Sequence, residues 1–128
     1  QVLEGKNKIP FTRFEASVGV DDGDIYIQKD LILNGFELNH ELRGKQANFS
    51  IDMCLEFVRN YSNNSVPIKQ TGKETFYSKR SKNDSLLDIN KTIKDQFNLL
   101  RIVNNNDYPA FFELNGHRYK LTIEKMEK

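Results

Sequence analysis

Strict alternation of apolar and polar side chains between residues 49 and 57 constrains this chain more than any other feature. The odd positions carry Phe, Ile, Met, Leu and Phe, whereas the even positions carry Ser, Asp, Cys and Glu. Because successive side chains of a β-strand point to opposite faces, this pattern predicts a strand with one face in the core and the other mostly in water. The expected fold must therefore place this strand in a half-buried sheet.

The residues before this strand favour three more strands. Period-two alternation recurs in residues 14–20, 25–33 and 36–43, and turn-forming residues separate these segments: the acidic cluster 21–24, Asn34-Gly35 and Gly44-Lys45. Asn-Gly between alternating segments is a strong hairpin signal, because a type I′ turn needs positive φ at both central residues. Residues 11–58 are therefore predicted to form a four-strand antiparallel meander.

A helix and a hairpin are predicted in the second half of the chain. An apolar stripe at spacings of 3, 4, 4 and 3 residues predicts an amphipathic helix over about 85–103 and consists of Leu86, Ile89, Ile93, Phe97 and Leu100. Ser85 and Asp88 match a capping box at its start. A second Asn-Gly pair lies in FFELNGHRYKLTIE, residues 111–124, and predicts a C-terminal β-hairpin.

Together these segments predict an α+β fold that is mainly β. We expect an antiparallel meander or open barrel of about six or seven strands, with one amphipathic helix and the C-terminal β-hairpin. A chain of 128 residues is long enough for one core, so residues 1–128 are expected to be a single domain. Within it, residues 1–10 are expected to form a flexible N-terminal arm and residues 59–84 a long basic loop.

The inventory of reactive side chains argues against an enzyme. The two histidines, His40 and His117, are too few for a zinc site, which needs three or four ligands. Asp52 and Glu56 are the best carboxylate pair, but two acids on a wet strand face are usually only solvated. The sequence has neither a Gly-rich phosphate loop nor a nucleophile elbow. We therefore predict no catalytic residues, no metal and no cofactor.

Charge is distributed unevenly along the chain. Residues 1–56 carry six Lys/Arg against ten Asp/Glu, whereas residues 57–101 carry nine against four. The basic segment IKQTGKETFYSKRSK, residues 68–82, also contains an aromatic pair. Basic side chains neutralise phosphates and aromatic rings stack on bases, so the segment predicts a nucleic-acid contact. Its candidate contact residues are Lys69, Lys73, Phe76, Tyr77, Lys79, Arg80 and Lys82.

Two stretches carry resemblances to known families. Gly72-Lys73, SKRSKNDSLLDINKTIKDQF and DYPAFFELNGHRYKLTI resemble the end of the pseudobarrel DNA-binding domains of restriction endonucleases, and GDIYIQKDL is similar to that family's early strand. This resemblance implies a grip on the DNA major groove, with Lys73, Lys79, Arg80 and Lys82 as phosphate or base contacts. Residues 10–58 instead resemble the AsmA-type β-repeats of envelope lipid-transport proteins.

The favoured function is therefore a non-catalytic domain that binds duplex DNA through the basic loop, for example the specificity module of a restriction or defence system. The alternatives are a structural or protein-interaction β-domain of a virus particle or cell envelope, which could form a homo-oligomer, and a lipid or small-ligand binder. No apolar run approaches the roughly 20 residues of a transmembrane helix. The single Cys54 favours the cytoplasm, whereas five Asn-x-Ser/Thr sequons leave secretion or the cell envelope as the alternative.

Overall fold

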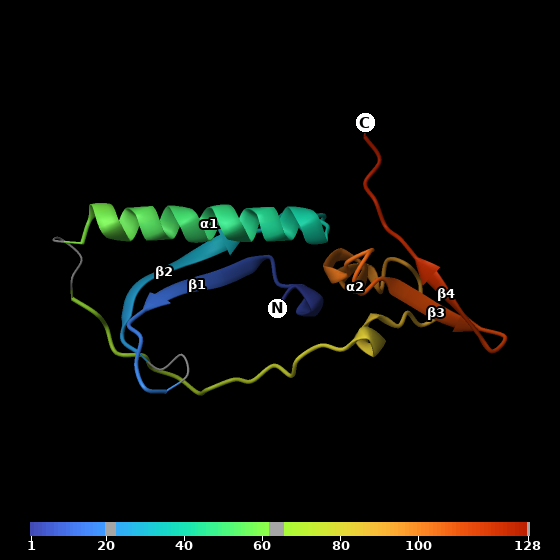
Figure 1. The fold of residues 1–128 in the computed structure, drawn as a ribbon, viewed down its shortest axis with the longest axis horizontal. Helices are drawn as coiled ribbons and strands as arrows, with labels where there is room; N and C mark the ends of the chain where they lie inside the picture. Colours follow the sequence, from blue (N-terminus) through green and yellow to red (C-terminus); the bar gives the residue numbers. More distant parts are fainter. Residues whose placement is uncertain (20–22, 62–65, 128) are drawn as a thin grey trace. The chain divides into compact units, whose positions relative to one another are not determined.

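The computed structural model describes residues 1–19, 23–61 and 66–127, and Figure 1 shows their ribbon. The chain divides into two compact units. Unit 1 comprises residues 1–7, 34–43 and 77–128, and unit 2 comprises residues 8–33 and 44–76. Residues 20–22 and 62–65 lie outside the described residues, and with them the first half of the acidic turn expected at 21–24. Each unit is described by itself.

Unit 2 is built on a two-stranded antiparallel sheet. Strand β1 (Lys8–Phe14) pairs with β2 (Ile25–Ile32), and the register runs from Lys8 opposite Ile32 to Arg13 opposite Ile27. The register shifts between Arg13 and Phe14, so the pairing is irregular at that end. Ile68 forms an isolated bridge to Ile25 beyond the shift.

The strands predicted at 36–43 and 49–58 are wrong, because helix α1 (Asn39–Arg59) occupies this region. The rings of Phe49 and Phe11 of β1 pack edge to face, with their centroids 5.1 Å apart. The rings of Phe57 and Tyr26 of β2 pack in the same way, with centroids 5.2 Å apart. Met53, between them on the same helix face, is buried. Positions 49, 53 and 57 satisfy a helical spacing of four residues as well as a strand spacing of two. The alternation at 49–57 therefore came from a helix with apolar residues on two faces.

Unit 1 holds the principal apolar cluster among the described residues. It contains two short 3₁₀ helices, η1 (Val2–Glu4) and η2 (Lys82–Ser85), then α2 (Phe97–Ile102), β3 (Ala110–Leu114) and β4 (His117–Leu121). The buried residues Leu100, Val103 and Ala110 form its centre. The partly buried residues packed against this centre are Leu87, Phe97, Leu99 and Ile123.

The C-terminal hairpin expected around Asn115-Gly116 forms. Strands β3 and β4 pair antiparallel, from Ala110 opposite Leu121 to Leu114 opposite His117. Asn115 and Gly116 have φ angles of 52° and 77°, the two positive values that a type I′ turn requires.

The helix predicted over about 85–103 is reduced to α2, residues 97–102. The Gln96 side chain organises the preceding loop: its Oε1 accepts from the Asp88 N–H at 2.6 Å, and its Nε2 donates to the Asp88 carbonyl at 2.9 Å. Leu87 donates its N–H to the Phe111 carbonyl at 2.7 Å, which draws this part of the chain to the edge of β3. Ile93, expected on the buried stripe, is 72% exposed. Tertiary hydrogen bonds therefore replace the predicted helix.

The predicted fold class is also wrong as a whole. The described residues form four strands in two separate two-stranded sheets, and they show no barrel and no meander of six or seven strands. The physical reason is the misread segment 36–58, which supplies one helix in place of two strands. No helix among the residues that the structure describes is both long and apolar enough to cross a membrane.

Candidate anion-binding site

The seven residues predicted to contact nucleic acid are divided between the two units. Lys69, Lys73 and Phe76 belong to unit 2, and the four that follow from Tyr77 belong to unit 1. All seven side chains are exposed. Two of them, Arg80 and Lys82, line one cavity in unit 1, and the other five do not contribute to it.

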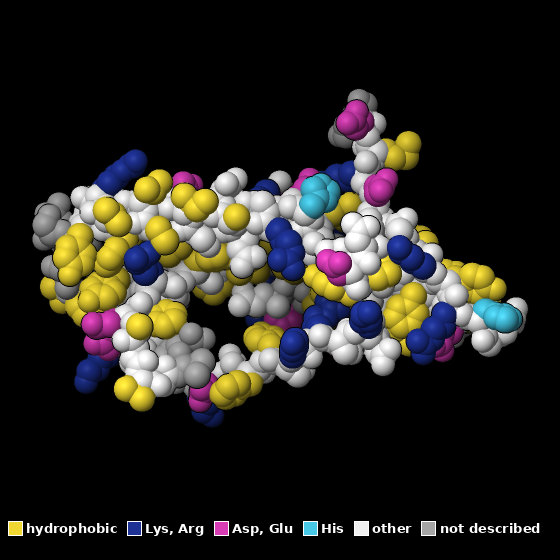
Figure 2. Space-filling view, in the orientation of Figure 1, with side chains coloured by type: hydrophobic (Ala, Val, Ile, Leu, Met, Phe, Trp, Pro, Cys, Tyr) yellow, Lys and Arg dark blue, Asp and Glu magenta, His cyan; other side chains and the backbone are white. Residues whose placement is uncertain are grey.

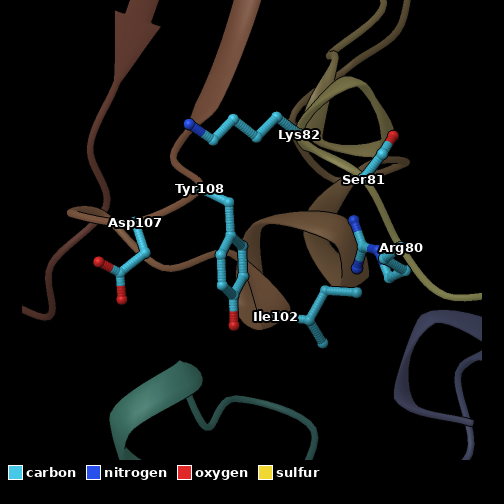
Figure 3. Close-up of a pocket in the computed structure, with 6 residues that line it drawn as sticks. All are labelled: Arg80, Ser81, Lys82, Ile102, Asp107 and Tyr108. Atoms are coloured by element: carbon cyan, nitrogen blue, oxygen red, sulfur yellow. The ribbon is translucent and has the colours of Figure 1, made fainter.

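This cavity has a volume of about 440 Å³ and lies between η2 and the segment that follows α2 (Figure 3). Six residues line it: Arg80, Ser81, Lys82, Ile102, Asp107 and Tyr108. In Figure 3 the Tyr108 ring stands between Asp107 on one side and Arg80 and Ser81 on the other, with the Lys82 side chain extending above it. The cavity thus combines two cationic groups, one carboxylate and one phenol.

A capping box fixes the chain where Arg80 enters the cavity. The Asp84 carboxylate accepts from the Ser81 N–H at 2.5 Å and from the Ser81 hydroxyl at 3.1 Å, at the start of η2. These two bonds, from the backbone first and the hydroxyl second, lower the pKa of Asp84, and the charge of Arg80 adds to the effect. Arg80 Nη2 in turn donates to the Asp84 carbonyl at 2.9 Å. This hydrogen bond fixes the guanidinium through one of its nitrogens.

Tyr108 is held from three directions. Its N–H donates to the Asn104 carbonyl at 3.1 Å, and its carbonyl accepts from the Ser85 hydroxyl at 3.5 Å. Arg43 Nη2 donates to its phenol oxygen at 3.2 Å and adds a third cation near the cavity. Two cationic side chains line the cavity and a third contacts its phenol, against one lining carboxylate, that of Asp107, which also accepts from Asn104 Nδ2 at 3.2 Å. This charge balance favours an anionic ligand.

A second cavity of about 310 Å³ shares Lys82 and Tyr108 with the first. It reaches the hairpin and is also lined by Asn83, Pro109, Phe111, Arg118, Tyr119 and Lys120. Arg118 is engaged there, because its Nε donates to Glu113 at 2.8 Å and its guanidinium lies 5.4 Å from the centre of the Phe111 ring. The cationic character of the first cavity therefore continues toward the hairpin.

Within the described part of the chain, no group of three or more His, Cys, Asp or Glu side chains could hold a metal ion. Asp52 and Glu56, the carboxylate pair considered from the sequence, lie on helix α1 instead of a strand face, and Glu56 forms an ion pair with Lys29. Cys54 Sγ accepts from Arg13 Nη1 at 2.9 Å.

Sequence reasoning missed Arg43, Asp107 and Tyr108. Arg43 lies 65 residues before Tyr108 in the sequence, so no local pattern could have joined them. Asp107 and Tyr108 lie directly before the predicted hairpin, in a stretch that carries no sequence signal of a binding site.

Comparison with known proteins assigns this fold to formyltransferases. The chain is 33% identical over 102 residues to a methionyl-tRNA formyltransferase of Thermosipho melanesiensis, covering 79% of the chain and 33% of that protein. It is 29% identical to the methionyl-tRNA formyltransferase of Lactobacillus johnsonii, covering 94% of the chain and 38% of that protein. The chain thus spans only about a third of the length of these curated relatives. No family model matches it.

Solved structures agree on the fold. A methionyl-tRNA formyltransferase from Clostridium thermocellum matches with a TM-score of 0.70 at 24% identity, over 97% of this chain and 53% of that one. A 4-N formyltransferase from Francisella tularensis matches with a TM-score of 0.75 at 21% identity, over 99% of this chain and 55% of that one. The described architecture is therefore that of a segment of these enzymes.

These comparisons overturn the functional expectations drawn from the sequence. The resemblances to restriction-endonuclease pseudobarrels and to AsmA-type repeats are wrong, because the relatives and structural neighbours are formyltransferases. The predicted non-catalytic, duplex-DNA-binding function is wrong for the same reason, as are the alternatives of a structural β-domain or a lipid binder. The prediction that the chain is not an enzyme is contradicted as well, because the relatives and the structural neighbours are enzymes. Both resemblances rested on turns and alternating segments that many β-containing folds share.

Proposed function

We propose that the chain is part of an N-formyltransferase, an enzyme that moves a formyl group from a donor to a primary amine. The observation that carries this proposal is the 33% identity to a methionyl-tRNA formyltransferase over 79% of the chain. The fold shared with solved formyltransferases over nearly the whole chain supports it. In such a transfer the amine nitrogen attacks the formyl carbon, the bond between the donor and that carbon breaks, and the amine loses one proton.

The cavity lined by Arg80, Lys82 and Tyr108 contributes binding to this reaction. Arg80 and Lys82 supply charge-assisted hydrogen-bond donors, which suit the oxygens of a phosphate. The two kinds of relative are named for a methionyl-tRNA and for a 4-N position. A phosphate could come from a tRNA or from a small phosphorylated amine, and both would present the same chemistry to these side chains. We assign the cavity to the phosphate of the amine acceptor.

Formyl transfer is tested with the full-length protein in a cell extract supplied with isotope-labelled formate, so that the donor need not be chosen. Two acceptors are compared, methionyl-tRNA and a nucleotide-linked 4-amino sugar, and labelled products are identified by mass spectrometry. We expect label in the amide of one acceptor only, and the labelled acceptor identifies the source of the phosphate. Absence of label in both, while a known formyltransferase labels its own acceptor in the same extract, would refute the proposal.

Variants of the cavity test the assignment of the phosphate. Replacing Arg80 or Lys82 by Ala removes a binding interaction that substrate and transition state share, so the KM for the acceptor should rise about tenfold while kcat stays unchanged. Lys69→Ala is the matched control, because Lys69 is also exposed and basic but lies outside the cavity. An equal rise in KM for Lys69→Ala would mean that general surface charge, not the cavity, attracts the acceptor.

For the other residues of the predicted contact set, a contact with the ligand stays a prediction. We propose that Lys79, one residue before Arg80, assists approach of the anionic acceptor by its charge alone. A cytoplasmic location fits the proposed function, and these 128 residues contain only one cysteine, Cys54.

A further inference from the structure

Helix α1 has apolar residues on two opposite faces. The face formed by Phe49, Met53 and Phe57 packs on β1 and β2, as described above. The opposite face carries Ile51, Leu55 and Val58, which are 56%, 46% and 70% exposed. Exposed Gly44 and Ala47 extend this face by one turn, so that its members recur at spacings of 3, 4, 4 and 3 residues. We call these five residues the outer stripe, and Figure 2 shows hydrophobic side chains along α1.

A surface helix normally has one apolar stripe, whereas a helix that is apolar on both sides lies between two layers of a larger protein. The outer stripe contacts no second layer among the described residues of unit 2, which supplies only the sheet beneath α1. That sheet is itself small. Among the described residues, β1 and β2 pair with each other and with a single bridging residue, Ile68, and a two-stranded sheet is marginally stable. In this part of the chain, α1 and the sheet therefore pack on each other and on no third layer.

We propose that the outer stripe is covered by the part of the full-length protein that lies outside these 128 residues. The inference rests on the proposed function. The two solved formyltransferases are much longer than this chain. Their alignments include 97% and 99% of this chain but only 53% and 55% of the enzymes. The remaining half of such an enzyme belongs to the same polypeptide and is therefore available to cover an exposed apolar face.

The occupant is an apolar helix. Ridges of side chains at spacings of three and four residues fit into the grooves of a second helix. The small residues Gly44 and Ala47 allow the backbone of that helix to approach closely at one end. The same addition would place the β1–β2 sheet and α1 within one larger hydrophobic layer, which accounts for both unpartnered elements with a single neighbour.

A second copy of the chain is the competing occupant. In an antiparallel pair of α1 helices centred on Ile51, Gly44 would face Val58 and Ala47 would face Leu55, so small residues would oppose large ones. Such a pair forms by mass action and separates on dilution, whereas a cover from the same polypeptide does not depend on protein concentration.

Thiol labelling of the full-length protein distinguishes these cases. In a background in which every native cysteine, Cys54 included, is replaced by Ser, Ile51→Cys and Val58→Cys place a thiol on the outer stripe, and Asp52→Cys is the matched control on an exposed polar position of the same helix. Reaction with iodoacetamide should be at least about tenfold slower at 51 and 58 than at 52, because the covered thiols react only through local opening. This protection should persist through roughly a hundredfold dilution.

Equal labelling rates at the three positions, or protection that disappears on dilution, would overturn the proposal, and the second outcome would assign the stripe to a dimer. Formyl transfer is measured on the same samples. Labelled thiols in an active formyltransferase refute the cover alone. Protected thiols in a protein without formyl transfer refute the proposed function and leave the cover standing.

Discussion

The two Asn-Gly pairs of this chain have the same two residues and different structures. Asn115 and Gly116 both have positive φ and close the hairpin between β3 and β4. At the other pair only Gly35 has positive φ, 94°. There the chain leaves β2 and enters helix α1 instead of returning as a strand.

The difference arises from what binds the backbone of each turn. The N–H groups of Asn34 and Gly35 donate to the two carboxylate oxygens of Glu37, at 2.5 and 3.1 Å. Glu37 is buried with Arg101, whose Nη2 donates to the same carboxylate at 2.9 Å and whose Nε donates to the Glu37 carbonyl at 3.0 Å. A side chain 64 residues away therefore fixes the first turn, whereas the second turn is fixed by its own residues and its strand pairing.

The largest expected effect comes from removing the distant partner of the first turn. Arg101→Met leaves the Glu37 carboxylate buried without its cation, which should lower the free energy of unfolding by about 3–5 kcal/mol. The midpoint of urea unfolding measures this loss. The matched control is Arg118→Met in the hairpin, where the ion pair with Glu113 is exposed and should contribute about 1 kcal/mol or less. Equal losses for the two variants would contradict the distinction between a tertiary and a local turn.

A smaller effect is expected at Gly35. A Cβ built there would lie 3.5 Å from Asn7 Nδ2, an ordinary contact, so space does not forbid Ala. The positive φ of 94° does disfavour it, and Gly35→Ala should cost about 2 kcal/mol through backbone strain. Urea unfolding again measures the loss. Gly44→Ala is the control, because Gly44 lies inside helix α1 without a positive φ and Ala favours a helix, while the added methyl stays small for the neighbour proposed at the outer stripe. A loss at Gly44 as large as that at Gly35 would rule out positive φ as the cause.

Gly116→Ala should cost less again, about 1 kcal/mol, because its φ of 77° is strained for Ala but its surroundings are open. The effect should be confined to the hairpin, because this turn joins two strands that pair directly with each other. Amide hydrogen exchange of β3 and β4 should accelerate while exchange in α1 stays the same. Faster exchange in both regions would show that the hairpin turn is coupled to the rest of the fold.

Features that depend on neighbouring residues could be predicted from the sequence. The hairpin followed from Asn115-Gly116 and its alternating flanks, and Arg80 and Lys82 followed from the density of basic residues. The segment 36–58 was not readable in the same way, because its apolar residues satisfy both a strand and a helix with two apolar faces. Alternation over nine residues then favoured the wrong period.

The candidate site could be predicted only in part for a related reason. Arg80 and Lys82 lie in one basic segment, but Tyr108 and Arg43 reach the cavity from distant parts of the chain. The charge of the segment indicated an anionic ligand without indicating which one. Many ligands are anionic, so the electrostatic argument could not distinguish a contact with DNA from a site for another anion. The similarity to formyltransferases came from comparison with known proteins and not from the charge.

The smallest expected effect is a difference between the two turns in their response to low pH. After the first turn, helix α1 begins at a carboxylate: Glu41 accepts from both the Lys125 ammonium and the Leu38 N–H at 2.8 Å. The Lys125 contact first, and the Leu38 bond second, hold the pKa of Glu41 below its ordinary value of 4.5. The turn at Asn115-Gly116 is closed by the backbone pairing of β3 and β4.

A carboxylate with a lowered pKa in the folded state stabilises that state fully above its ordinary pKa, and this contribution is lost as the pH falls through the lowered value. Between about pH 6 and about pH 3 the amide NMR signals of residues 38–42 should therefore lose their folded positions before those of 115–117. Glu41→Gln should remove this difference, because the amide keeps an acceptor for Leu38 but does not titrate. If the signals of both turns change at the same pH in the parent and in the variant, Glu41 does not control the start of α1, and the contrast between the two Asn-Gly pairs rests on Glu37 and Arg101 alone.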